Sequence, residues 1–176
     1  MQVSHMVSAV FDDPNLIGHA GLVPVLQLAQ RAGLHDLVGA HLSVPSPNLV
    51  AKTSSVIAGM LCGADSIDDL DVIRHGGMRR VFEDVRAPST LGTFLRSFTF
   101  GHVRQLDAVN TRLLSSLCGL APGLLSGADQ LTYVDVDDTI REVHGYAKQG
   151  VAYGYSKVKG LNAQIAVLST PAAVSV

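Results

Sequence analysis

The stretch LTYVDVDDT, residues 131–139, decides how this chain is interpreted, because it joins a β-strand pattern to a cluster of carboxylates. Side chains alternate between the two faces of a strand, so Asp135 and Asp137 share one face. Their Cα atoms are expected roughly 7 Å apart, two residues along the strand. Val134 and Val136 point the other way, and we expect them to anchor the strand in a core.

Two carboxylates at this spacing repel one another unless a cation lies between them. Mg²⁺ takes one or two carboxylates together with water and phosphate oxygens, so it suits the pair Asp135 and Asp137. Asp138 points to the opposite face and is a weaker candidate ligand. The alternative is a strand that ends in a polar turn, with Asp138 and Thr139 capping the next segment of the chain.

The composition describes a globular chain of 176 residues, 47% of them hydrophobic, with a net charge of −2. Cys62 and Cys118 lie far apart, which fits neither a disulfide framework nor a zinc site and indicates thiols of a reducing cytoplasm. A basic leader and a run of 18 apolar residues are both lacking. We therefore expect a cytoplasmic protein without membrane partners.

Charge is unevenly distributed along the chain. Residues 1–73 carry a net charge of −5, residues 74–112 a net charge of +4, and the remainder −1. An arginine-rich middle segment is what contacts with DNA phosphates require, although a solvated helix surface has the same composition. The candidate DNA-binding residues of this segment are Arg79, Arg80, Thr90, Thr93 and Arg96.

Helical periodicity predicts short helices over the first two thirds of the chain. Asn48 and Ser89 are candidate N-caps, and Ser66 with Asp69 predicts a further helix start. The turn 79–84 and the helix that Pro88 begins are similar to a helix-turn-helix pair, with Thr90, Thr93 and Arg96 outward. The expected helices cover residues 22–32, 34–42, 50–61, 68–74, 88–96 and 102–120.

Beyond a hinge at residues 121–128 the period changes from helical to strand-like. We expect a meander of three strands, with turns around Gly150 and Gly160 and a last strand at 163–168. That last strand has no following helix to cover it, which indicates missing sequence. The expected class is α+β, an all-helical N-terminal part followed by the first strands of an incomplete sheet.

Several motifs come one after another in a recognisable order. The order begins with an all-helical N-terminal part and continues with four motifs. They are GADSIDDL at 63–70, PSTL at 88–91, DVDDT at 135–139 and a tyrosine-rich hairpin at 153–159 that leads into Lys-Gly. In this order the chain resembles DDE insertion-sequence transposases, from about Gly21 to its end. The co-linear order carries the resemblance, since no single motif is decisive.

The resemblance implies a helical DNA-binding and assembly region over residues 1–125 and the truncated start of an RNase H-like catalytic domain over 126–176. In that family two aspartates and a glutamate bind two Mg²⁺ ions, which activate the attacking water or 3′-hydroxyl and stabilise the leaving oxygen. The first aspartate matches Asp137 best and Asp135 second. The other two ligands belong downstream of the hairpin, so we expect a fragment that is inactive alone.

The partners implied are transposon-end DNA and a second copy or an intact transposase. Two alternatives remain open. The helical part can act as a non-catalytic DNA-binding or dominant-negative protein. Residues 133–139 are also similar to the nucleophile motif of haloacid-dehalogenase-like phosphatases, in which Asp135 would attack phosphorus and Asp137 would act as general acid.

Overall fold

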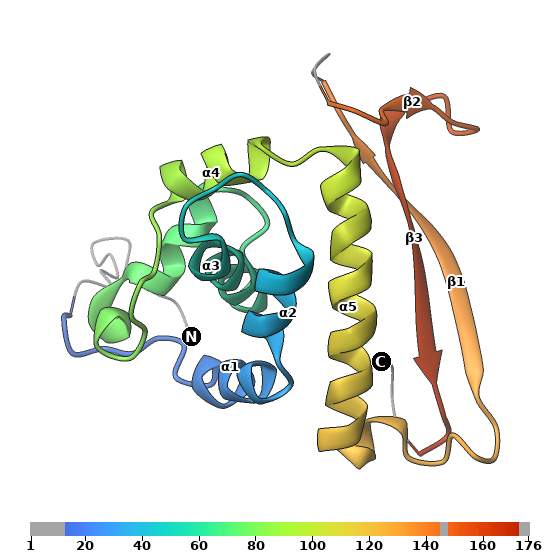
Figure 1. Cartoon of the computed structure of the whole chain (residues 1–176), viewed down its shortest axis with the longest axis horizontal. Coiled ribbons are helices and arrows are strands. Elements are labelled where there is room, and N and C mark those ends of the chain that lie inside the picture. The colour runs from blue at the N-terminus through green and yellow to red at the C-terminus, as the bar shows by residue number, and fades with distance from the viewer. Residues whose placement is uncertain (1–12, 145–147, 173–176) are drawn as a thin grey trace, which may run out of the picture. The chain divides into compact units, whose positions relative to one another are not determined.

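The computed structural model describes residues 13–144 and 148–172 (Figure 1). The chain divides into two compact units, Met1–Phe98 and Thr99–Val176. The first unit is helical, and the second combines a long helix with a three-stranded antiparallel sheet. The α+β class is thereby confirmed. The boundary expected from the resemblance, between residues 125 and 126, falls inside the second unit.

The helices of the first unit lie where the periodicity predicts them, except for the 3₁₀ helix at 76–80, which was not expected. Gly33, with φ of 89°, makes the left-handed turn that separates the first two, a conformation that glycine adopts at little cost. The first unit contains α1 Leu22–Arg31, α2 Leu34–His41, α3 Leu49–Leu61, the 3₁₀ helices η1 Asp68–Arg74 and η2 Gly76–Arg80, and α4 Pro88–Arg96.

The predicted helix caps have different outcomes. At η1 the expected reciprocal bonds form, because the backbone N–H of Ser66 donates to Asp69 Oδ2 over 3.1 Å and the N–H of Asp69 donates to Ser66 Oγ over 3.3 Å. Asn48 precedes α3 but makes no side-chain cap bond, so that prediction is wrong. Ser89 is also not a cap, because α4 begins at Pro88 and Ala87 takes the N-cap position.

A buried core holds the first unit together. Ile73 and Met78 of the 3₁₀ helices are 1% exposed, and they pack with Leu22 of α1 and Ala58 of α3. A side chain at Gly59 would overlap Leu70, so this glycine lets η1 pack closely on α3. The first unit therefore has a well-packed core of its own.

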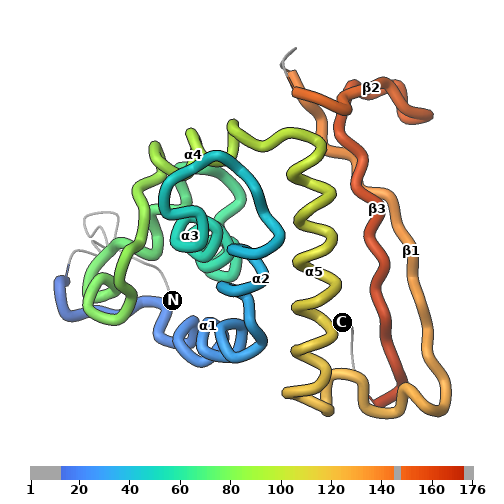
Figure 2. Tube along the Cα trace, in the orientation of Figure 1, coloured from blue at the N-terminus to red at the C-terminus, as the bar shows by residue number. Residues whose placement is uncertain are grey.

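The second unit contains α5 Phe100–Leu120, η3 Pro122–Leu125, β1 Tyr133–Glu142, β2 Ala152–Tyr153 and β3 Lys159–Ser169 (Figure 2). The strand order is β1-β3-β2, with both pairs antiparallel. The predicted meander order is therefore wrong. Gly160, predicted as a turn, lies within β3 opposite Glu142, where a Cβ would overlap the neighbouring strand, so the ladder runs on through it.

Hydrogen bonds join α5 to the strand region of its own unit. The backbone N–H of Phe100 donates to the Gln149 side-chain oxygen over 3.1 Å, next to the loop before β2. After the other end of the helix, the hydroxyl of Thr170 donates to the carbonyl of Ser126. The helix start itself has a capping box between Thr99 and His102. The Phe100–Gln149 bond thus ties the loop before β2 to the beginning of α5, and the Thr170–Ser126 bond ties the end of β3 to the segment after η3.

Candidate metal and nucleic-acid sites

The two candidate metal ligands lie in the middle of β1. Asp135 is opposite Val167 of β3 and Asp137 is opposite Ile165, so alternation puts both carboxylates on one face of the sheet. The whole stretch of β1 around them is exposed to solvent. The structure therefore puts the pair on one solvent-exposed face of β1, as strand alternation predicts.

The prediction that Val134 and Val136 anchor β1 in a core is wrong. Their side chains are 59% and 61% exposed, while Tyr133 on the carboxylate face is 53% exposed. Both faces of the β1–β3 ladder are thus open around the aspartates. The alternating pattern identifies the strand correctly, but burial also requires a second layer, and the described residues place none over either valine.

Asp137 and Asp135 differ in their local contacts. The backbone N–H of Asp138 donates to Asp137 Oδ1 over 2.8 Å, which orients the exposed Asp137 carboxylate. The side chain of Asp138 belongs to the opposite face of the strand. Among residues 13–144 and 148–172, no three His, Cys, Asp or Glu side chains form a cluster that suits a metal ion. The pair on β1 thus offers two carboxylates.

The candidate DNA-binding residues of α4 lie mostly on its exposed side. Thr93 and Arg96 are exposed, whereas Thr90 is half-buried. The Thr93 hydroxyl donates to the Ser89 carbonyl over 3.0 Å, and the Arg96 guanidinium donates to Thr93 Oγ1 over 3.4 Å. The charge of Arg96 therefore lies along its own helix.

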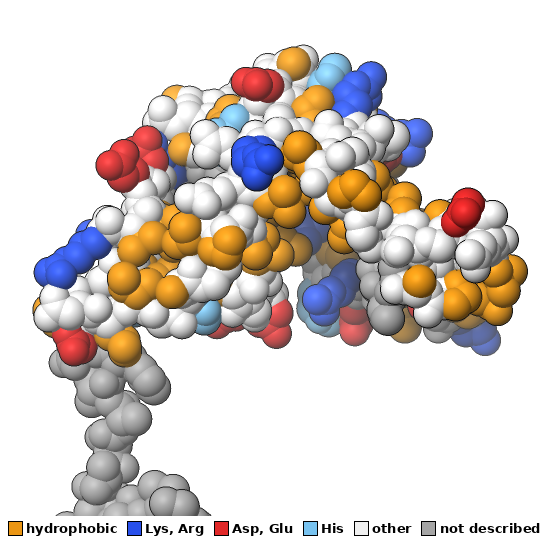
Figure 3. Space-filling model, turned by 90° about the horizontal axis from the view of Figure 1, so that it is seen from below, with side chains coloured by type: hydrophobic (Ala, Val, Ile, Leu, Met, Phe, Trp, Pro, Cys, Tyr) orange, Lys and Arg blue, Asp and Glu red, His pale blue; other side chains and the backbone are white. Residues whose placement is uncertain are grey.

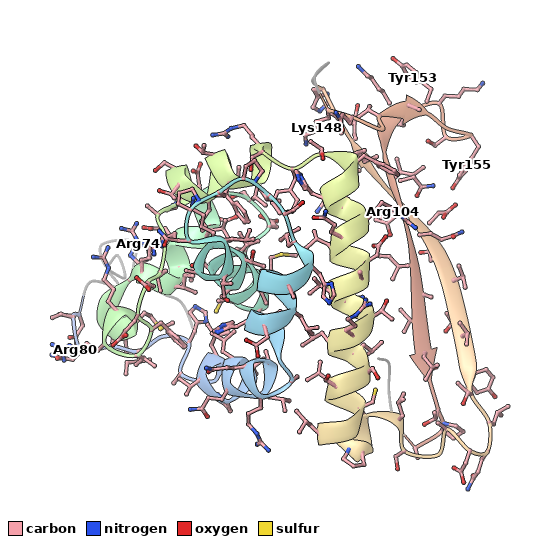
Figure 4. The ribbon with its side chains drawn as sticks, in the orientation of Figure 1. Arg74, Arg80, Arg104, Lys148, Tyr153 and Tyr155 are labelled. Carbon is pink, nitrogen blue, oxygen red and sulfur yellow. The ribbon has the colours of Figure 1, made fainter. Side chains whose placement is uncertain are left out.

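The arginines of η2 are exposed as well. Arg80 (Figure 4) donates to the side-chain oxygen of Asn15 over 2.7 Å. Arg79, the preceding residue, is also exposed. Arg74 forms an ion pair with Asp71, which offsets part of the local positive charge. On the face seen in Figure 3, basic and acidic side chains are scattered among hydrophobic ones, without one continuous basic surface.

A groove of about 990 Å³ in the helical unit was missed by the sequence reasoning. It is lined by residues of α1, α2 and α3 and of the segment 80–86, mainly apolar, with Arg80 and Arg86 among the polar residues. The Arg86 guanidinium contacts Asp84 over 3.3 Å, and its backbone N–H donates to Ser55 Oγ. No single motif marks this groove, because separate segments build it.

Cys62 lies beside the core of the helical unit. Burial raises the pKa of its thiol, because desolvation disfavours the charged thiolate. A protonated thiol is a poor nucleophile and a poor metal ligand. This residue therefore fits a packing role better than a chemical one.

A scan of protein families, a search of curated proteins and a search of solved structures each find no match for this chain. Over the part of the chain that is described, no helix combines the length and the apolar character needed to cross a membrane. The residues of the two units and their geometry are therefore the basis of any functional assignment.

Proposed function

We propose that this chain is the N-terminal part of a DDE transposase, in which β1 supplies the first metal-binding aspartate of an RNase H-like domain. One observation carries the proposal. Asp135 and Asp137 lie side by side on an open face, in the middle of a ten-pair antiparallel hairpin formed by β1 and β3. In this proposal the β1–β3 ladder is the opening of the sheet that the resemblance implies, with β2 in the connection between the two strands.

The donor set on β1 suits Mg²⁺, because both groups are hard carboxylate oxygens and the ion prefers such ligands. When bound, the metal would activate an attacking oxygen and stabilise the leaving oxygen of a phosphodiester. Asp137 is the better ligand of the two, since the Asp138 N–H fixes the orientation of its carboxylate. Asp135, two residues earlier, adds negative charge on the same face and draws a cation toward the strand.

The geometry favours this proposal over the phosphatase alternative. In doubly wound sheets, ligands bind beyond the carboxyl ends of parallel strands. Here Asp135 and Asp137 lie well inside β1, with an antiparallel partner opposite each of them. β1 also continues without interruption to Glu142. A long substrate backbone that lies across the strand fits this arrangement better than a small phosphoester at a strand end.

The exposed arginines support a contribution of the helical unit to DNA binding. Arg79 and Arg96 are exposed on a unit that folds around its own core. We propose that they contact DNA phosphates, and a non-catalytic DNA-binding role for the chain remains the second candidate. This DNA-binding role is supported if the affinity for transposon-end DNA falls steeply with salt and falls further in the double variant Arg79→Gln with Arg96→Gln. Salt-insensitive binding would contradict it.

The catalytic proposal is tested in a longer transposase that has the same motif order and the downstream ligands. Replacing its aspartate that matches Asp137 by asparagine is expected to abolish strand transfer while end binding is retained. Replacement of the aspartate that matches Asp138 is the control, because that side chain belongs to the other face. Full strand transfer after the first replacement would contradict the assignment. For the 176-residue chain alone, we expect no cleavage.

A further inference from the structure

The charges of the sheet are separated along the sequence. β1 carries four carboxylates and a single arginine, whereas beyond Glu142 the sequence has three lysines and no acidic residue. Those lysines are Lys148, Lys157 and Lys159, and all of them are in the short segment around β2. Arg141 and Glu142 of β1 lie at the same end of the ladder, so this end carries three lysines and one arginine against one carboxylate, although the whole chain is acidic.

Two tyrosines are presented at this basic end. Tyr153, the last residue of β2, is 72% exposed, and Tyr155 is 83% exposed. Large aromatic side chains are usually placed in cores or at interfaces, where their rings are covered. Figure 4 shows both rings pointing outward from the β2 end, with Lys148 in the loop before it. Their exposure is typical of a surface that receives a partner.

The backbone around these rings has a defined geometry. The N–H of Lys157 donates to the carbonyl of Gly154 over 3.0 Å and closes a tight turn with Tyr155 at its corner. Lys157 itself adopts a left-handed conformation, with φ of 59°. The bond from Phe100 to Gln149 holds the loop beside Lys148 against the start of α5. Tyr155 and Lys157 are therefore presented from one hydrogen-bonded turn, Tyr153 from the end of β2, and Lys148 from the loop before β2.

We propose that Tyr153, Tyr155, Lys148 and Lys157 form a binding surface for single-stranded DNA. Aromatic faces stack on unpaired bases of any sequence, and neighbouring lysines bind the phosphates between them, which is the combination found in single-strand binding grooves. A protein partner would equally use tyrosines, but it has no need for lysines that outnumber the one carboxylate of β1, Glu142, at this end of the sheet. The charge therefore favours the nucleic acid.

The location of this surface suggests a role for it in strand transfer. That role rests on the proposed function. β2 pairs with β3 at Gly160, which is opposite Glu142 of β1. Five residues separate Glu142 from Asp137, so this surface begins roughly 17 Å along the strand from the proposed metal ligand. A strand cut at Asp137 would therefore reach the tyrosines within a few nucleotides.

The test uses the 176-residue chain and a fluorescein-labelled oligothymidylate, in EDTA so that no metal contributes. Affinity is measured by anisotropy over a range of KCl concentrations. Tyr153→Ala and Tyr155→Ala are each expected to weaken binding roughly 5- to 100-fold. Phenylalanine at the same positions is expected to bind like the unmodified chain, because the aromatic ring is retained. Tyr133→Ala is the matched control, since Tyr133 is an exposed tyrosine on β1, opposite Ser169 at the other end of the ladder.

The lysines are tested through the salt dependence. Lys148→Gln and Lys157→Asn are each expected to reduce the slope of log affinity against log salt by about 0.7, the value for one single-strand phosphate contact. Asparagine is chosen at position 157 because it tolerates the left-handed backbone. Unchanged slopes would contradict the assignment of these two lysines.

Absence of oligothymidylate binding by the unmodified chain at low salt would overturn the proposal. So would equal affinity of the Tyr→Ala variants and the Tyr133→Ala control. The result is independent of the catalytic proposal, because Asp135→Asn with Asp137→Asn is expected to leave binding in EDTA intact or slightly tighter. Strand-transfer assays can therefore contradict the catalytic proposal while single-stranded DNA binding is confirmed. Binding can likewise fail while strand transfer is confirmed.

Discussion

The helical unit and the sheet use apolar residues in opposite ways. In the helical unit Ile73 and Leu91 are 1% and 0% exposed, whereas on the sheet Val136 and Ile165 are 61% and 47% exposed. Both regions have the hydrophobic period of their secondary structure. Periodicity thus reports the element that forms, while burial depends on whether another layer packs against it.

Truncating the core of the helical unit should have the greatest effect on stability. Leu91→Ala is expected to cost about 2–5 kcal/mol of unfolding free energy, because it leaves a cavity at a fully buried position. Val136→Ala on the sheet is the comparison and is expected to cost less than about 1 kcal/mol, since that side chain is already in water. Urea unfolding followed by circular dichroism measures both, and equal losses would remove the contrast between the two regions.

A buried charge in the helical unit gives the next effect. Lys52 is only 9% exposed, and its ammonium donates to Ser46 Oγ over 2.7 Å, with the ring of Phe94 at 5.9 Å. Ser46→Ala is expected to destabilise the unit by about 1–3 kcal/mol, because the buried ammonium loses its hydroxyl partner. Combining it with Lys52→Met is expected to recover part of that loss. A double variant that is less stable than Ser46→Ala would contradict this role of the Ser46 hydroxyl.

On the sheet the corresponding charge effect is smaller and has the opposite sign. Asp137→Asn removes one of two like charges on an exposed face, so we expect a gain of a few tenths of a kcal/mol at low salt. Added salt is expected to reduce the gain, because it screens exposed charges. Thermal unfolding at two ionic strengths measures this, and a loss of stability at low salt would contradict it.

The weakest of these effects concerns acid stability. Hydrogen bonds from Ser66 lower the pKa of the Asp69 carboxyl below its ordinary value of 3.8. A depressed folded-state pKa contributes stability that is present above the ordinary pKa and lost as pH falls through the lower folded value. Asp69→Asn is therefore expected to flatten the pH dependence of the unfolding free energy below about pH 4, as measured by urea unfolding at several pH values. Asp68→Asn, outside this capping box, is the control, and the same flattening there would contradict the assignment.

Sequence reasoning predicted the helical unit well, because its signals are local. Gly33 separates two helices and Pro88 begins another, and each of these residues acts within one turn. The order of the strands depends on pairing between distant segments. Gly160 has the composition of a turn, yet it lies within β3, since the close approach of Arg141 requires a residue without a side chain.

The candidate metal face could be predicted in part. Alternation correctly puts Asp135 and Asp137 on one side of β1, because it depends only on strand geometry. The contact between the Asp138 N–H and the Asp137 carboxylate could not be foreseen, since it depends on a side-chain rotamer. The tyrosines near β2 were visible in the sequence, but their exposure depends on the turn that Lys157 closes.

A Mn²⁺ titration of the chain, followed by paramagnetic broadening of its backbone NMR signals, tests the metal site on β1 without any need for catalysis. We expect the broadening to begin at Asp135 and Asp137 and at their cross-strand partners Val167 and Ile165, and to disappear in Asp137→Asn with Asp135→Asn. Broadening that begins instead at the acidic helix η1 of the helical unit, or that is unchanged in the double variant, would contradict a metal site on β1.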